Sequence, residues 1–135
     1  MLQQSLNSGD NIPTLGLGTW LAEDGLADSI ITALDVGYRH IDCAAIYKNE
    51  AIIGAALQQK FSKGFQRADL WLTSKLWNSF HKPEDVRPAC LQTLQDLNVD
   101  YLDFISHNLK KNLHTELFFS KGGVYSILAS LSVLV

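Results

Sequence analysis

The stretch GYRHIDCAAIYKNE, residues 37–50, decides the fold because it joins the end of one helix, a short strand and the start of the next helix. Its first residue, Gly37, ends a helix predicted over residues 25–36, whose apolar positions recur at helical spacing. Residues 38–41 are typical of a short strand, and Asn49 predicts the N-cap of a second helix. Helix, strand and helix joined by short connections indicate an α/β architecture.

The same alternation continues on both sides of this stretch. The turn-forming residues 7–11 predict a hairpin that leads into a strand over residues 14–17. Further strands are predicted over residues 70–74 and 101–105, with a helix that starts at Pro83 between them and is irregular near Pro88. Because crossover helices separate the strands, the predicted fold class is α/β with a parallel sheet.

The composition is that of an ordinary globular domain. The 135 residues are 47% hydrophobic and 19% charged, and the net charge is −3, which argues against binding of nucleic acid or of a membrane surface. Cys43 and Cys90 form no CxxC pair, so we expect free thiols in the cytoplasm and no metal site. The N-terminus has no signal-peptide pattern. The final apolar run of twelve residues would rise only about 18 Å as a helix, which is too short to span a hydrocarbon core of about 30 Å.

Chemically reactive side chains follow the predicted strands, where parallel α/β folds place their active sites. Gly18-Thr19-Trp20 follows the first strand, Asp42 and Tyr47 the second, Lys75 the third, and His107 lies near the end of the fourth. A lysine cation beside a phenol stabilises the phenolate, and a carboxylate keeps the lysine charged and fixed. The set favours delivery of a proton to a carbonyl oxygen, while the hydride must come from a cofactor.

Four motifs, in the order IPTLGLGTW, GYRHIDCAAIYKNE, LTSKLWN and LNVDYLD, resemble the aldo-keto reductase family. The resemblance runs from about residue 6 to residue 104. It implies a (β/α)8 barrel closed at its base by an N-terminal hairpin, of which this chain would hold about four βα units. It also implies NADPH-dependent reduction of small aldehydes or ketones to alcohols.

The resemblance implies a role for each matching residue. The catalytic set is Tyr47 as proton donor, Lys75 beside it, Asp42 as the partner of the lysine, and His107 to orient the substrate oxygen. The residues implied at the nicotinamide end of the cofactor are Gly18, Thr19, Trp20 and Asp42. The residues implied as walls of the substrate pocket are Trp20, Ile46, Tyr47 and Trp77, a lining that suits apolar carbonyl compounds.

The pattern changes at His107. The family histidine follows the YLD motif after four hydrophobic residues, whereas His107 stands four residues after Asp103, one position early. A slip of one residue turns a strand side chain to the opposite face, unless a bulge restores its direction. His107 is therefore either the displaced family histidine or an unrelated one.

We expect residues 1–105 to be the N-terminal half of a reductase barrel and residues 106–135 to be a tail without family resemblance, produced by a frameshift, a retained intron or altered splicing. A complete barrel takes about 250 residues, so the truncated chain would lack most of the cofactor site and would be inactive or impaired.

The alternative is a non-catalytic half-barrel that acts as an interaction module or self-associates through its exposed edge. A weaker alternative is membrane association through residues 124–135.

Overall fold

The computed structural model describes residues 2–22, 24–107, 116–120 and 123–128, with the backbone alone described from residue 107 onward. The strands are β1 (Gln3–Ser5), β2 (Asn11–Pro13), β3 (Leu17–Gly18), β4 (His40–Asp42), β5 (Trp71–Leu76), β6 (Phe104–His107), β7 (Glu116–Ser120) and β8 (Gly123–Leu128). The α-helices are α1 (Leu26–Asp35), α2 (Glu50–Ser62) and α3 (Pro83–Leu97), and the 3-10 turns are η1 (Ala45–Tyr47), η2 (Arg67–Asp69) and η3 (Asn78–Phe80).

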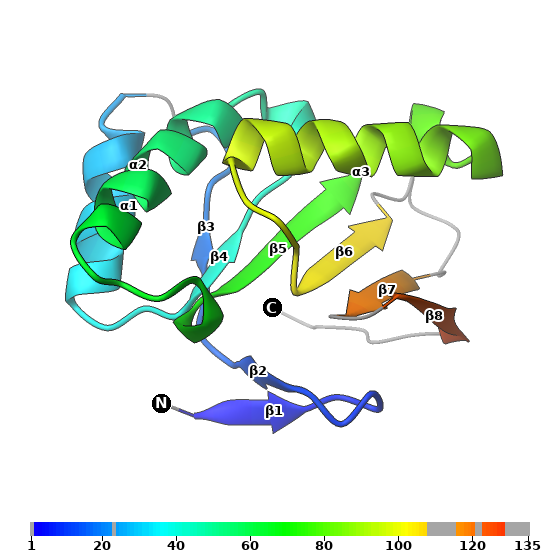
Figure 1. The fold of residues 1–135 in the computed structure, drawn as a ribbon, viewed down its shortest axis with the longest axis horizontal. Helices are drawn as coiled ribbons and strands as arrows, with labels where there is room; N and C mark the ends of the chain where they lie inside the picture. Colours follow the sequence, from blue (N-terminus) through cyan, green and yellow to red (C-terminus); the bar gives the residue numbers. More distant parts are fainter. Residues whose placement is uncertain (1, 23, 108–115, 121–122, 129–135) are drawn as a thin grey trace.

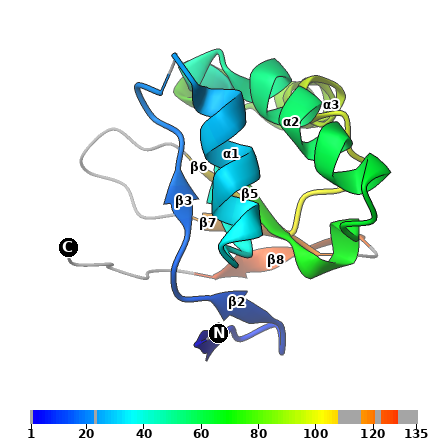
Figure 2. The same cartoon turned by 90° about the vertical axis from the view of Figure 1, so that its left-hand side faces the viewer.

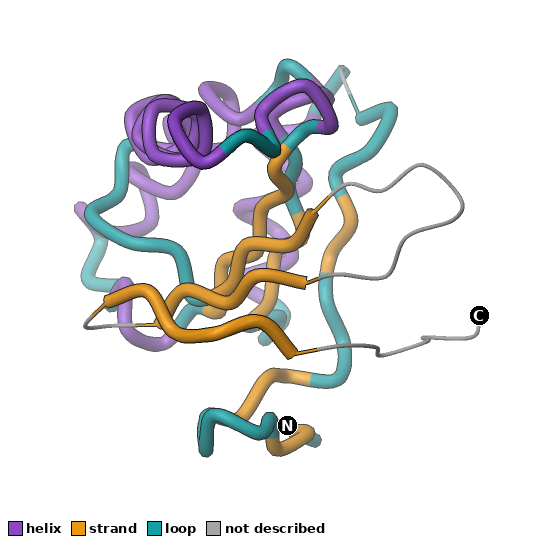
Figure 3. Tube along the Cα trace, turned by 90° about the vertical axis from the view of Figure 1, so that its right-hand side faces the viewer, coloured by secondary structure: helices purple, strands orange, loops and turns teal. Residues whose placement is uncertain are grey.

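The centre of the fold is a parallel sheet in the order β3-β4-β5-β6, with α1, α2 and α3 on one face (Figure 1). The antiparallel hairpin β1–β2 lies at the end where the parallel strands begin, as Figure 2 also shows. A second hairpin, β7–β8, runs beside β6 (Figure 3). The predicted α/β class with a parallel sheet is confirmed, and the described strands do not close a barrel.

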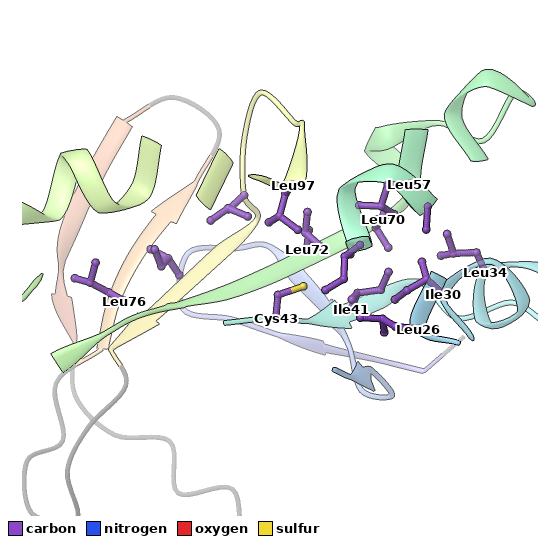
Figure 4. Close-up of a cluster of buried hydrophobic side chains, with 14 residues drawn as sticks. Leu26, Ile30, Leu34, Ile41, Cys43, Leu57, Leu70, Leu72, Leu76 and Leu97 are labelled. Atoms are coloured by element: carbon purple, nitrogen blue, oxygen red, sulfur yellow. The ribbon is translucent and has the colours of Figure 1, made fainter. Parts of the chain in front are cut away.

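The core lies between the helices and the sheet. Alternate residues of β4 and β5, such as Ile41, Leu72 and Leu76, turn toward the helices and are buried (Figure 4). They meet apolar side chains on one stripe of each helix, including Ile30 of α1 and Leu57 of α2. The opposite face of the same strands is therefore left for polar side chains.

Several predicted boundaries were wrong by one to three residues. The strand expected over residues 101–105 is instead Phe104–His107. The reason is that Arg67 binds the carbonyl oxygen of Tyr101, and the Asp103 carboxylate accepts the backbone N–H of Leu72 at 2.9 Å. A side chain thus takes the place of a ladder bond there.

The first parallel strand also differs from the prediction. It is Leu17–Gly18 and not residues 14–17, because the hairpin strand β2 ends at Pro13 and Gly16 then passes close to the ring of His40. A Cβ at Gly16 would lie 2.8 Å from Nδ1 of that ring. The helix α3, by contrast, is continuous from Pro83 to Leu97 in spite of Pro88.

Candidate active site

The ends of β4 and β5 bring a carboxylate and a lysine ammonium into direct contact. Asp42 pairs with Thr73 in register, and Lys75 lies two residues further along β5, so both side chains leave the same face of the sheet. The Lys75 ammonium lies 2.7 Å from each carboxylate oxygen of Asp42 and donates a third bond to the Cys43 carbonyl oxygen at 3.0 Å. Three acceptors therefore fix the position of this cation.

Tyr47 approaches the same cation from the connection that follows β4. It is the last residue of η1, and its ring centroid lies 5.2 Å from Lys75 Nζ, within the range of a cation–π contact. The side chains of Lys75 and Asp42 are 20% and 38% exposed, so the ion pair is accessible from solvent. The ammonium thus lies between a carboxylate and a phenol at the open carboxyl ends of the central strands β4 and β5.

The loop after β3 is tied to the same strand end. The backbone N–H and the hydroxyl of Thr19, which is fully buried, both donate to the Asp42 carbonyl oxygen, at 3.2 and 2.9 Å. Trp20, the next residue, is 69% exposed. Gly18 has open space where a Cβ would stand.

A pocket of about 490 Å³ lies beside this loop. Its lining consists of Trp20, Leu21, Ala22, Ile46, Tyr47, Asn49 and Trp77. All four residues that the resemblance implied as substrate walls are in this set. Sequence reasoning missed Leu21, Ala22 and Asn49; Asn49 was expected only to cap a helix.

His107 is placed by its backbone alone. It is the last residue of β6 and pairs with Leu76, whereas Ser106 pairs with Lys75. Its role as a catalytic histidine remains a prediction.

A second buried polar group behind the sheet was also missed. The Ser74 hydroxyl donates to Glu50 at 2.6 Å, and Thr93 of α3 also hydrogen-bonds to this carboxyl group. Burial is the main cause that raises the pKa of Glu50, and these hydrogen bonds partly offset it. A glutamate in the first turn of a helix is usually exposed, so the sequence held no signal for this contact.

His40 lies on the polar face below Asp42. Its ring nitrogens contact the Pro13 carbonyl oxygen at 3.3 Å and the Thr73 hydroxyl at 2.9 Å. Desolvation lowers the pKa of His40, which favours the neutral ring. This side chain links the hairpin to the sheet rather than facing the pocket.

The described residues also limit other kinds of site. Within residues 2–22 and 24–107, no group of histidine, cysteine and acidic side chains is arranged to hold a metal ion. None of the helices in the described part is long and apolar enough to cross a bilayer.

The open strand ends leave accessible groups on which a ligand could rest. Gly18 leaves room for close approach, Trp20 offers an exposed flat ring, and Asp42 keeps part of its carboxylate accessible. These groups meet where ligands bind in parallel α/β folds.

Comparison with known proteins agrees with this geometry. The model of the aldo/keto reductase family matches residues 14–131, a range that runs past residue 105, where the recognisable motifs end. An aldo/keto reductase of Synechocystis sp. is 55% identical over 100 residues, which are 73% of this chain and 31% of that protein. Aldo-keto reductase family 1 member A1 of Gallus gallus is 54% identical over 102 residues, again 73% and 31%. The chain thus spans about a third of the length of these curated relatives.

Solved structures show the same relationship. The aldose reductase of Schistosoma japonicum is 42% identical with a TM-score of 0.75, over 91% of this chain and 40% of that one. The aldo-keto reductase of Bombyx mori in complex with NADP is 33% identical with a TM-score of 0.75, over 78% of this chain and 37% of that one. These neighbours are (β/α)8 barrels, and the described sheet and helices correspond to their N-terminal portion. The chain belongs to the aldo/keto reductase family.

Proposed function

We propose that this chain carries the proton-donating part of an NADPH-dependent reductase that converts aldehydes and ketones to alcohols. The observation that supports this most directly is the Lys75 ammonium, held by both oxygens of Asp42 and 5.2 Å from the ring centroid of Tyr47. A lysine fixed in this way can stabilise the negative charge that forms on a neighbouring phenol when the phenol gives up its proton.

In the proposed reaction, the Tyr47 hydroxyl donates its proton to the carbonyl oxygen as negative charge develops there. Lys75 stabilises the phenolate that remains, and Asp42 holds the Lys75 ammonium in position. Bound NADPH would supply the hydride, and its nicotinamide end would be held by Gly18, Thr19, Trp20 and Asp42.

The proposed substrate is a small, largely apolar carbonyl compound. Trp20, Ile46 and Trp77 give the pocket an apolar lining beside the Tyr47 phenol. We keep His107 as the proposed residue that orients the substrate oxygen, with an unrelated histidine as the alternative.

We further propose that the 135-residue chain by itself has little or no activity. It spans 31% of its curated relatives, and in this family the groups that bind most of the cofactor come from the later part of the barrel. The direct test is to mix the purified chain with NADPH and 4-nitrobenzaldehyde and to follow NADPH oxidation by absorbance. Turnover at the rate of a full-length relative would refute this part of the proposal.

The catalytic assignment is tested in a chimaera in which residues 1–105 replace the matching part of the Gallus gallus reductase. We expect the chimaera to reduce the aldehyde and Tyr47→Phe to lower kcat by about 10²- to 10⁴-fold, the usual contribution of a general acid. Tyr38→Phe, on a tyrosine outside the pocket, is the matched control. Equal kcat values for Tyr47→Phe and Tyr38→Phe would contradict the assignment.

The second candidate is a self-associating half-barrel without catalysis. It is favoured by the short edge strand β3 and by three exposed apolar side chains around it, those of Leu15, Trp20 and Leu21. Sedimentation velocity over a range of concentrations tests it, since a strictly monomeric chain would exclude self-association.

We also propose a cytoplasmic location without nucleic-acid partners. The free cysteines, Cys43 and Cys90, suit a reducing compartment, and the net charge of −3 gives no electrostatic attraction to a polyanion. Fractionation of the cells that express the chain would test the location.

A further inference from the structure

Asn49 precedes the first residue of α2, but its side chain does not cap that helix. The side-chain amide turns away and donates to the carbonyl oxygens of Thr19, at 2.8 Å, and Ala22, at 3.2 Å. Both N–H groups of the amide are therefore used on the loop between β3 and α1. An asparagine placed to stabilise a helix end is used to bind a different segment of the chain.

The two carbonyl groups flank Trp20 and Leu21, two exposed residues of that loop. Leu21 has φ of 56°, in the left-handed region that side-chain-bearing residues rarely adopt, and the turn is closed from within only by a long bond of 3.4 Å from the Ala22 N–H to the Thr19 carbonyl oxygen. Thr19 is anchored a second time through its two bonds to the Asp42 carbonyl oxygen. The segment Thr19–Ala22 of this loop, called the Trp20 loop below, is thus fixed at both of its ends.

Asn49 also lines the pocket. It follows η1, the turn that holds Ile46 and Tyr47, with only Lys48 between them. Lys48 has φ of 56°, in the left-handed region, and its N–H donates to the Ala45 carbonyl oxygen at 3.1 Å, so the chain turns sharply between Tyr47 and Asn49. One side chain therefore connects the wall that carries Trp20 with the wall that carries the proposed proton donor.

The burial of Asn49 has an energetic cost. The residue is 4% exposed, and its Oδ1 atom has no hydrogen-bond partner among the described residues. An unsatisfied buried acceptor destabilises the folded state, because it loses its bonds to water without gaining a partner. Asn49 makes no capping bond, so the two bonds from Nδ2, and not the helix end, account for an asparagine here.

We propose that Asn49 is a positioning residue that holds the Trp20 loop against the Ile46–Tyr47 turn and so sets the width of the substrate pocket. That the occupant is a carbonyl compound rests on the proposed function. The positioning itself depends only on the bonds from Asn49 to Thr19 and Ala22.

The test labels the 135-residue chain with 5-fluorotryptophan and records its fluorine NMR spectrum. The sequence has three tryptophans, Trp20, Trp71 and Trp77, and each signal is assigned by replacing one of them with phenylalanine. In Asn49→Asp the carboxylate cannot donate and repels both carbonyl oxygens. We expect the Trp20 signal at neutral pH to shift by more than its linewidth and to broaden, while the Trp71 signal stays unchanged.

Acidification provides a rescue that a general folding defect would not show. A protonated aspartic acid regains one O–H donor, so the Trp20 signal of Asn49→Asp should return toward its wild-type position at low pH. The matched control is Asn7→Asp, on an exposed asparagine of the β1–β2 turn, which should leave the Trp20 signal unchanged at every pH.

A second variant covers the case in which Asn49→Asp does not fold. Asn49→Ser keeps a good N-cap residue but is too short to reach the two carbonyl groups, so the Trp20 signal should broaden and acid should not restore it. An unchanged Trp20 signal in either folded variant would overturn the proposal, as would a parallel shift of the Trp71 signal. The spectra need neither NADPH nor turnover, so this result is independent of whether the chimaera reduces an aldehyde.

Discussion

Gly54→Ala should separate α2 from α3. Gly54 is buried in α2 at the point where it crosses the C-terminal end of α3. A Cβ at this position would lie 2.5 Å from the carbonyl oxygen of Asp96, and 2.7 and 2.8 Å from the carbonyl carbon and oxygen of Leu97. These are backbone atoms, so no side chain can rotate to make room.

The size of the effect follows from two opposing contributions. Ordinary contact begins at about 3.4 Å, so the two helices would have to move apart by about 0.9 Å at this crossing. Overpacking of a core typically costs about 1–3 kcal/mol, and rigid backbone on the receiving side places this site near the upper end. Alanine recovers about 1 kcal/mol of helix propensity relative to glycine. The expected net loss in the free energy of unfolding is about 2 kcal/mol.

Urea unfolding followed by circular dichroism measures this loss. With a slope of about 1–2 kcal/mol per molar urea, the midpoint should fall by about 1–2 M. Ala55→Gly, on the exposed side of the same helix, is the matched control and should cost about 1 kcal/mol through propensity alone. A Gly54→Ala protein at least as stable as wild type would refute the close packing of α2 on α3.

Three further predictions concern the buried polar groups. Because burial raises the pKa of Glu50, the contribution of this residue to stability is fully present below its ordinary pKa and is lost as the pH rises through the raised value. The urea midpoint of the wild type should therefore fall over this pH range, and Glu50→Gln should remove that fall. Arg67→Lys should cost about 2 kcal/mol in thermal or urea unfolding, because lysine cannot keep the guanidinium bonds to Asp103 and to two backbone carbonyl groups. Burial raises the pKa of both Cys43 and Cys90, but of these two thiols only Cys43 is fully buried. A thiol reagent should therefore label Cys90 slowly in the native chain and Cys43 only after unfolding. Equal labelling rates of the two thiols in the native chain would contradict the fold.

The sequence predicted the parts of the fold that depend on strand and helix order. The alternation of elements led to a parallel sheet, and the parallel sheet required Asp42 and Lys75 to meet at one edge. The structure places their side chains 2.7 Å apart. The topology alone accounts for the neighbouring positions of the two residues at the strand ends, whereas the direct pairing was implied by the family resemblance.

The features that could not be predicted depend on which hydrogen-bond partner a polar side chain finds in the folded chain. Asn49 matched the N-cap pattern, but the Thr19 and Ala22 carbonyl groups, 30 and 27 residues away in sequence, compete for its amide. Asp103 lies inside the strand predicted over residues 101–105, but its carboxylate accepts the Leu72 N–H in place of a ladder carbonyl group, and β6 starts only at Phe104. Such contacts join distant segments, so local sequence does not contain them.

Strand register links the core to the candidate site. Along β5, Leu72 and Leu76 turn to the helices, and Lys75 therefore turns to the opposite face and reaches Asp42. A slip of one residue would expose the leucines and bury the lysine, so the hydrophobic core itself enforces the position of the cation. Residues 104–107 pair with residues 73–76 without interruption, which sets Ser106 beside Lys75 and His107 beside Leu76. The backbone of His107, the proposed substrate-orienting residue, is therefore in register with the core residue Leu76, one position beyond Lys75.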